Sequence, residues 1–536
     1  MARDITKIPV IDLFAGPGGL GEGFSAYACS GEQPFRIKLS IEKDPVAHQT
    51  LQLRSFFRQF PQNEVPDAYY NFLRQADSPE NERRNKLFSQ YPEQAEQVDR
   101  EARLAELGKE DPHTIHKWIQ HALESCSDWV LIGGPPCQAY SIAGRSRNHG
   151  NDDYDAEKDH RQYLYLEYLQ IIAEHQPAIF VMENVKGLLS ATLKNQYIFE
   201  RMYEDLRKPE KALKRENRPV RSPAHAGRQS RYKLYSLVKS GEISNVNLSD
   251  FVVYMEDFGI PQKRHRVIIL GIREDIHITP KILEKQNPVA VDNVLSDLPK
   301  VRSGLSREED SAEAWINRLH EIVESSWFAS LQTGGNGKIH EKLSIALKEI
   351  RHSVDRSRGG EFMPCDDIGI NYEHEREWFL DSRIGGVCNH ITRGHIVKDL
   401  YRYFYAACFA EVKDLSPKLK DFPDDLLPDH KNAKRAANGS PLFVDRFRVQ
   451  LSDNPATTVT SHISKDGHYY IHYDPTQCRS LTVREAARLQ TFPDNYFFCG
   501  PRTSQYVQVG NAVPPLLARQ IADIVHDVLK RKGVSS

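Results

Sequence analysis

The stretch 8-IPVIDLFAGPGGLGEGF-24 joins a short apolar run to five closely spaced glycines. The apolar part is typical of a buried β-strand, and a glycine-rich turn that opens a helix is typical of the first unit of a doubly wound α/β fold. A second strand, 36-RIKLSIEKD-44, follows and carries Glu42 at its end, where such folds hold a ribose hydroxyl. A tight turn alone would explain the glycines but not Glu42. No Gly-Lys-Ser/Thr follows, which excludes a P-loop. We therefore expect an adenosine-containing cofactor here.

Further apolar strands alternate with helical segments along the chain. The strands are expected at 128–134, 178–184 and 266–272, with a helix at 161–175, so the sheet should be mostly parallel. We divide the chain into an α/β domain over 1–275, with a charged helical insertion at about 50–127, a smaller irregular domain over 276–478, and a segment over 479–536 that returns to the first domain.

Composition limits the class of protein. The 536 residues are 40% hydrophobic and 27% charged, with a net charge of -2, so nucleic-acid contacts would have to come from local basic patches. No apolar run approaches the roughly 20 residues that span a bilayer, and the first strand leaves no room for a signal peptide. None of the eight cysteines forms a CxxC pair, so we expect no metal and no disulfide scaffold. A bacterial cytoplasmic protein associated with the nucleoid is the expectation.

Three chemically active groups lie next to predicted strands, at one edge of the sheet. Cys137 lies in 133-GGPPCQAYSIAGR-145, Glu183 follows the apolar run AIFVM, and 262-QKRHR-266 precedes a strand. Each group also has an ordinary structural explanation. Cys137 could be a structural cysteine in a tight turn, Glu183 could cap a helix, and the arginines could lie on a solvated edge. Together, a thiol, a carboxyl and guanidinium groups at one sheet edge predict a site of nucleophilic catalysis.

These motifs closely resemble the DNA cytosine-C5 methyltransferases, which use S-adenosyl-L-methionine. The blocks that carry the resemblance occur in the family's order: DLFAGPGGLGEGF, IEKD, GGPPCQAYSIAGR, HRQYLYLEYLQI, FVMENVKGLL, GIPQKRHRVIILG, RSLTVREAARLQTFPD and QYVQVGNAVPPLLARQIA. They cover residues 10–275 and 479–525. The resemblance implies a Rossmann-like methyltransferase domain, and 276–478 corresponds to the variable target-recognition domain, where 455-PATTVT-460 is similar to the family.

The family's catalytic roles transfer to matching positions. Cys137 would add to C6 of a cytosine flipped out of the duplex, and Glu183 would hold N3 and the exocyclic amine. Arg266 would bind O2, with Arg264 and Gln262 supporting the loop and the substrate. An intact set of these residues argues against the alternative of a catalytically inactive DNA-binding relative.

The cofactor would be held by residues of several motifs. These are Phe14, Ala15, Gly16, Pro17, Gly18, Gly19, Leu20, Glu42, Pro135, Asn511 and Val513. Two features depart from the family pattern. The Asp beside the adenine is not clear, and we take Asp111 as its candidate; the Trp that often follows the ribose-binding Glu is replaced by Lys43.

Double-stranded DNA is the expected partner. Ser141 and Arg145 would grip phosphates as the nucleophile loop closes, and Arg393 is a candidate base contact. The resemblance also implies a restriction-modification or phage-defence system, with a cognate restriction endonuclease or defence proteins, and we expect a monomer. A tRNA cytosine-C5 methyltransferase of the same fold stays open. An amino-methyltransferase is disfavoured because Cys, not an aromatic residue, follows Pro-Pro.

Overall fold

The computed structural model of the chain describes residues 7–124, 126–136, 164–190, 192–193, 196–221, 230–241, 247–333, 336–353, 355–365, 375–428 and 446–535. Within them, no helix is long and apolar enough to cross a membrane.

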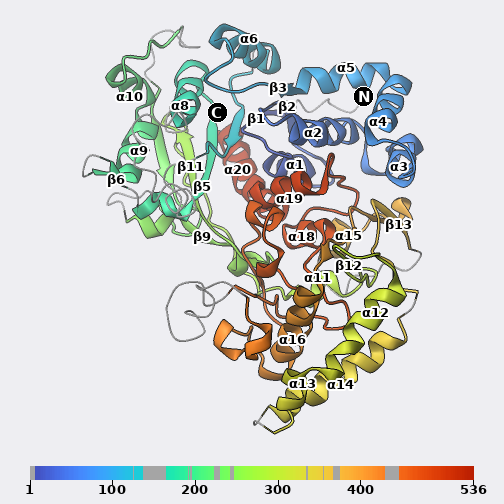
Figure 1. Cartoon of the computed structure of the whole chain (residues 1–536). Coiled ribbons are helices and arrows are strands. Elements are labelled where there is room, and N and C mark those ends of the chain that lie inside the picture. The colour runs from blue at the N-terminus through green and yellow to red at the C-terminus, as the bar shows by residue number, and fades with distance from the viewer. Residues whose placement is uncertain are drawn as a thin grey trace.

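One eight-stranded sheet organises the first domain (Figure 1). Its strands are β1 (Ile8–Leu13), β2 (Phe35–Glu42), β3 (Ala102–Leu104), β4 (Val130–Gly133), β5 (Ile179–Val185), β8 (Tyr232–Tyr235), β9 (Val252–Tyr254) and β11 (His265–Arg273). The order is β3-β2-β1-β4-β5-β11-β8, with β9 also on β11. The five strands from β3 to β5 are parallel, whereas β11 runs antiparallel to β5, β8 and β9. The expectation of an α/β fold with a mostly parallel sheet is confirmed.

Helices cover both faces of this sheet, and further helices belong to the rest of the chain. The α-helices of the described residues are α1 (Gly19–Ala26), α2 (Pro45–Phe57), α3 (Asp67–Arg74), α4 (Glu80–Gln90), α5 (Pro92–Glu101), α6 (Pro112–Leu123), α8 (Leu164–His175), α9 (Ile198–Arg207), α10 (Pro209–Arg215), α11 (Val291–Leu295), α12 (Ala312–His320), α13 (Ser326–Ser330), α14 (Gly337–Arg351), α15 (Arg376–Phe379), α16 (Val397–Lys413), α18 (Val483–Leu489), α19 (Arg502–Asn511) and α20 (Pro515–Ser535). Helices α1 and α20 pack on one face, α6 and α8 on the other.

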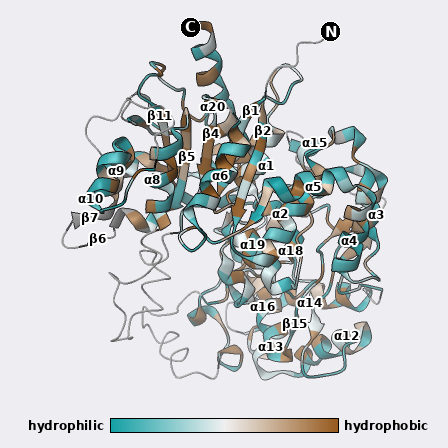
Figure 2. Cartoon of the chain, turned by 90° about the horizontal axis from the view of Figure 1, so that it is seen from above, coloured by the Kyte–Doolittle hydropathy of each residue, from teal (hydrophilic) through white to brown (hydrophobic). Residues whose placement is uncertain are grey.

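Alternation along the strands explains this layering. Val10 and Val130 belong to the core shared with α1 and α20, whereas their neighbours Ile11 and Leu131 belong to the core shared with α6 and α8. Successive side chains of a strand point to opposite faces of the sheet. A strand that is apolar throughout therefore needs helices packed on both faces. Figure 2 shows hydrophobic residues concentrated along the central strands.

The segment expected to be a helical insertion contributes to the sheet as well. It holds α3, α4 and α5, as its charged composition indicated, but β3 pairs in parallel with β2. The three-residue strand is too short to show a period in the sequence. Because β3 extends the parallel sheet, part of the 50–127 segment belongs to the doubly wound fold itself.

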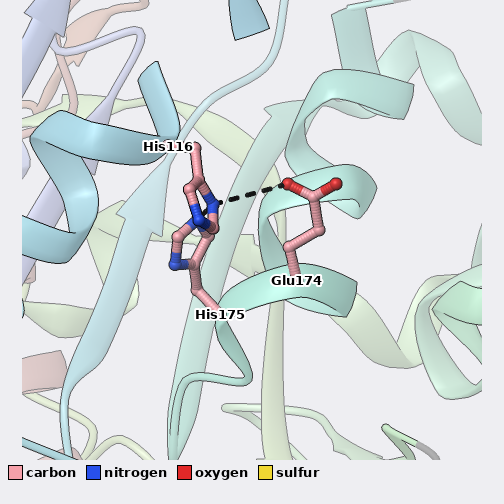
Figure 3. Close-up of side chains that lie close together, drawn as sticks. All are labelled: His116, Glu174 and His175. Atoms are coloured by element: carbon pink, nitrogen blue, oxygen red, sulfur yellow. Dashed lines mark hydrogen bonds and ion pairs between the residues drawn. The ribbon is translucent and has the colours of Figure 1, made fainter. Parts of the chain in front are cut away.

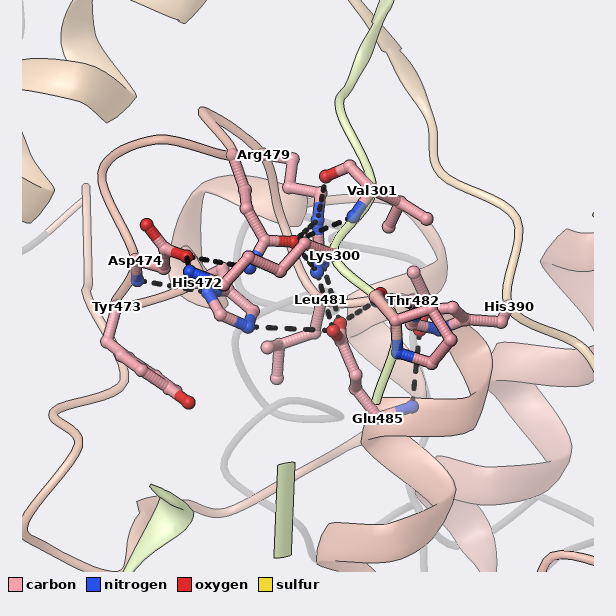
Figure 4. A network of polar contacts seen from close by, with 12 residues as sticks. Lys300, Val301, His390, His472, Tyr473, Asp474, Arg479, Leu481, Thr482 and Glu485 are labelled. Carbon is pink, nitrogen blue, oxygen red and sulfur yellow. Dashed lines mark hydrogen bonds and ion pairs between the residues drawn. The ribbon is translucent and has the colours of Figure 1, made fainter. Parts of the chain in front are cut away.

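The second domain packs α12, α14 and α16 around a separate core (Figure 1). A buried polar network lies where this domain meets the returning segment (Figure 4). Arg479 donates to both carboxylate oxygens of Glu485, at 2.7 and 2.6 Å, and to the carbonyl of Val301 at 2.9 Å. Glu485 also forms a capping box with Thr482 at the start of α18, so one buried ion pair connects three segments of the chain.

Candidate active site

A cavity of about 630 Å³ lies at the carboxyl ends of β1, β2, β4 and β5. The start of the antiparallel β11 reaches the same edge, so Arg266 joins residues that follow the parallel strands. Residues from both ends of the chain line this cavity. Those predicted from the sequence are Phe14, Ala15, Gly16, Pro17, Gly19, Leu20, Glu42, Pro135, Glu183, Arg264, Arg266, Asn511 and Val513.

The turn after β1 is shaped for close approach. Phe14 has φ 57° and Gly18 has φ 99°, and a left-handed conformation at a bulky residue such as Phe14 is uncommon outside functional sites. A Cβ atom on Gly19 would lie 2.3 Å from the carbonyl oxygen of Val513. Gly19 is therefore required for contact between α1 and the segment that leads into α20. Gly18 shapes the turn but is not among the lining residues.

Glu42 closes one side of the turn. Its Oε2 accepts the Gly16 amide at 2.7 Å, and its Oε1 accepts the Asp44 amide at 2.7 Å. Burial raises the pKa of Glu42, and these amides act in the opposite direction. The carboxylate is thus fixed at the end of β2 and faces the cavity, where it suits a ligand that donates hydroxyl groups.

Asp12 is a lining residue that the sequence reasoning missed. Both of its carboxylate oxygens are buried without a hydrogen-bond partner among the described residues. Burial raises its pKa to about 7, although the charge of Arg58 acts to lower it. Unpaired buried acids are costly. The Gly21 amide also acts to lower this pKa, and a positive charge in the cavity would further favour the carboxylate.

Glu183 and Arg266 form an ion pair inside the cavity. The Nε of Arg266 lies 2.9 Å from Oε1 of Glu183, and both side chains are 13% exposed. Burial lowers the pKa of Arg266 and the Glu183 charge raises it. Arg266 also donates to the carbonyl of His265. The pair presents a carboxylate and a guanidinium next to each other, a combination suited to a ring with donors and acceptors on adjacent atoms.

Arg264 and Gln262 hold the framework behind this pair. Arg264 is 1% exposed and donates to the carbonyls of Val459, Gly510 and Ala512. Gln262, fully buried, accepts from the Val459 amide and donates to Gln490. These contacts tie the residues just before β11 to the 455–460 segment and to the end of α19. We therefore describe both as positioning residues, although Arg264 also reaches the cavity wall.

Some predicted residues lie elsewhere. Asp111 is exposed and caps α6 by accepting the His113 amide; it does not line the cavity, whereas Glu106 and Leu107 do. Arg393 lies 4.3 Å from the ring centre of Tyr506 and donates to the carbonyls of Ile463 and Ser464. Cys137, Ser141 and Arg145 lie outside the described residues, which reach Pro136 on the cavity wall.

The position of Asp111 has a local explanation. An Asp before Pro112 is an ordinary N-cap, and the three residues after β3 pass the cavity first. The other lining residues missed include Lys43, Asn184, Thr460, Ser461 and Gln508. Thr460 and Gln508 lie in runs already quoted as similar to the family and so had a usable signal. Thr460 ends PATTVT, and Gln508 lies in QYVQVGNAVPPLLARQIA.

The sequence is similar to those of known proteins. The family model of C-5 cytosine-specific DNA methylases matches residues 112–209 and 247–526. The type II methyltransferase M.Bpa9945I of Bacillus paralicheniformis is 33% identical over 97% of this chain and 99% of its own length. M.DdeI, a type II methyltransferase of Desulfomicrobium norvegicum, is 26% identical over 73% of this chain and 71% of its own length. The DNA (cytosine-5-)-methyltransferase M.ApeKI of Aeropyrum pernix is 26% identical over 75% of this chain and 81% of its own length. Glu183, Arg266 and Asn511 fall in the matched ranges.

Proposed function

Because the chain belongs to the C-5 cytosine-specific DNA methylase family, we propose that it methylates C5 of a flipped cytosine in a specific duplex sequence, through a bond between Cys137 and C6. The family relationship makes the protein a DNA (cytosine-5-)-methyltransferase. The covalent step, the flipped base and the residue roles belong to the proposal.

The cavity fits S-adenosyl-L-methionine, which when bound supplies an electrophilic methyl group on a cationic sulfonium. Glu42 would accept the ribose hydroxyls, and Phe14 would pack on the adenine. The unpaired carboxylate of Asp12 suits the positively charged methionine end. Asn511 lines the same cavity from the end of α19. These residues would hold and orient the cofactor while the surrounding segments exclude water.

The substrate side follows from the chemistry of cytosine. C5 is a weak nucleophile until a thiolate adds at C6 and breaks the aromaticity of the ring. Cys137 would form that bond, and Glu183 would hold N3 and the exocyclic amine as charge develops. Arg266 would bind O2. C5 would then take the methyl group as the bond between methyl and sulfonium breaks, with the electron pair left on sulfur. Loss of the C5 proton to a base and expulsion of the Cys137 thiolate would then restore the aromatic ring.

The observation that carries the proposal is the single cavity shared by two charged elements. Glu42 and its glycine turn form one wall, and the Glu183–Arg266 pair forms another. A methyl donor held by the first would therefore face a base held by the second. The segment after Pro136, which carries Cys137, starts at that same wall.

Mechanism-based trapping tests the covalent step. Sequencing for 5-methylcytosine in DNA from cells that express the protein first identifies the target sequence. A duplex with 5-fluorocytosine at that position, incubated with the cofactor, should then form a complex that survives denaturing electrophoresis, because the C5 fluorine cannot leave as the proton does. Cys137→Ala, checked for folding by its unfolding temperature, should form none. Equal trapping by Cys137→Ala would overturn the mechanism.

The relatives named type II methyltransferases support a place beside a cognate restriction endonuclease or in a phage-defence system. Purified genomic DNA from expressing cells should resist an endonuclease of the same specificity. If the expressing cells gain 5-methylcytosine in tRNA and none in DNA, the tRNA alternative replaces this proposal.

A further inference from the structure

We propose that His116, Glu174 and His175 bind a Zn²⁺ ion that fastens α6 to α8. The cluster lies apart from the cavity described above, and none of its residues lines that cavity. The cysteine pattern predicted no metal, and this site uses no cysteine. The inference is also independent of the methyl-transfer chemistry.

The three side chains converge from two helices (Figure 3). Nδ1 of His116 lies 3.1 Å from Nε2 of His175 and 4.0 Å from Oε2 of Glu174. One ligand atom from each residue lies within 4.8 Å of the others. Tetrahedral zinc with bonds of about 2.0–2.2 Å sets its ligand atoms roughly 3.3–3.5 Å apart. The two nitrogens, 3.1 Å apart, lie slightly closer than this spacing, and the glutamate oxygen, 4.0 Å from Nδ1 of His116, must move inward.

The carboxylate is oriented for this role. Oε1 of Glu174 accepts the Gln170 amide group at 2.6 Å and the Arg221 backbone amide at 2.9 Å. These bonds fix the carboxylate plane and leave Oε2 on the side of His116. Metal-binding carboxylates are commonly held by such outer contacts.

The side-chain types match the preference of a metal ion. His175 is 7% exposed, and an imidazole nitrogen is the commonest protein ligand of metals. Two imidazoles and one carboxylate suit Zn²⁺ better than Mg²⁺ or Ca²⁺, which prefer oxygen ligands. Water would occupy the fourth position.

The ion would act on the elements that flank the nucleophile segment. Helix α6 leads into β4, and α8 follows residue 163, so the two helices enclose the stretch that holds Cys137 in the sequence. The indole Nε1 of Trp129 donates to the carbonyl of His175 at 3.1 Å, which anchors the same corner to the entry of β4. Zinc would stabilise this corner of the fold.

Metal content and cobalt spectroscopy test the proposal. Tag-free full-length protein, purified without chelator, should retain about one zinc per chain by mass spectrometry after dialysis. Replacement by Co²⁺ should give visible d–d absorption without a thiolate charge-transfer band, because no cysteine is a ligand. Zinc added to the chelator-treated protein should raise its unfolding temperature, and Mg²⁺ should not.

Variants separate a metal site from a plain pair of hydrogen-bonded histidines. His116→Ala, at a half-buried position, should lose the zinc and the cobalt spectrum, as should Glu174→Gln. The matched control His121→Ala removes an exposed histidine from the same helix and should keep both. No zinc in the wild-type protein, or equal zinc in His116→Ala and His121→Ala, would overturn the proposal and leave the histidine pair as a hydrogen bond.

Discussion

The Nε of Arg266 lies 2.9 Å from Oε1 of Glu183, across the antiparallel pairing of β11 with β5. Arg266 pairs in register with Val185, two residues beyond Glu183, so the two side chains are diagonal neighbours on one face. The register of two strands thus sets the distance between the carboxylate and the guanidinium.

Glu183→Gln should abolish most of the methylation rate. The amide keeps the shape but loses the charge and the proton exchange, and a positioned acid–base group contributes about 10²- to 10⁴-fold. Single-turnover transfer of labelled methyl groups to duplex DNA measures the loss. The control Glu256→Gln removes the carboxylate that contacts His265 outside the cavity and should retain the wild-type rate. An unchanged rate in Glu183→Gln would contradict the assigned role.

Glu42→Ala should weaken cofactor binding by roughly 10- to 100-fold, the range expected for lost hydrogen bonds to a charged group. The substitution also releases the Gly16 amide that shapes the turn. Calorimetry with S-adenosyl-L-homocysteine measures the dissociation constant. Glu124→Ala, at an exposed position paired with Lys38, is the control and should bind normally. Equal affinity in both variants would remove Glu42 from the cofactor site.

Gly19→Ala should lower the free energy of unfolding by about 1–3 kcal/mol, the usual cost of overpacking. The added methyl group would meet the Val513 carbonyl at 2.3 Å and push the closing segment from α1. Urea denaturation measures the change. Gly337→Ala places a methyl group in open space at the start of α14 and should be neutral or slightly stabilising.

The free energy of unfolding should depend on pH through the ionisation of Glu485. Burial acts to raise its pKa, but the charges of Arg479 and His472 and the hydrogen bond from Arg479 together outweigh burial and hold the pKa well below the ordinary value. The stabilisation is therefore fully present above the unfolded-state pKa and is lost as pH falls below it. Wild-type unfolding free energy should drop more steeply from about pH 6 to about pH 3 than that of Glu485→Gln.

A comparison at neutral pH completes that test. Breaking one partner of a buried ion pair costs about 3–5 kcal/mol, so Glu485→Gln should be strongly destabilised. Glu411→Gln, which removes a half-exposed partner of Lys342, should cost less than about 1 kcal/mol. Similar costs for the two variants would show that the network of Figure 4 contributes little.

The sequence predicted five strands of the sheet (β1, β2, β4, β5 and β11) and part of the cavity wall because both are local signals. Glycine turns, acidic strand ends and apolar runs recur at fixed places in an α/β fold, and Phe14, Glu42 and Asn511 meet in one cavity as those places require. Local sequence signals gave no prediction where a residue's role depends on groups that are distant in the sequence. The role of Asp12 depends on which groups surround it in three dimensions, and the short β3 has meaning only beside β2.

Arg393 illustrates the same limit from the other side. Its residue type suits base recognition, but its guanidinium lies over Tyr506 and donates to two carbonyls. Nothing in the surrounding sequence names those partners. Its contact with DNA stays a prediction, as do those of Ser141 and Arg145.

The meeting of Phe14 with Asn511 and Val513 in one cavity has a consequence during synthesis on the ribosome. A nascent chain makes β1 and its turn first, yet the opposite wall is translated after the whole region between residues 276 and 478. A truncated product therefore has no complete cofactor site. Under the proposed function, methyl transfer therefore requires a chain that already carries residues 276–478.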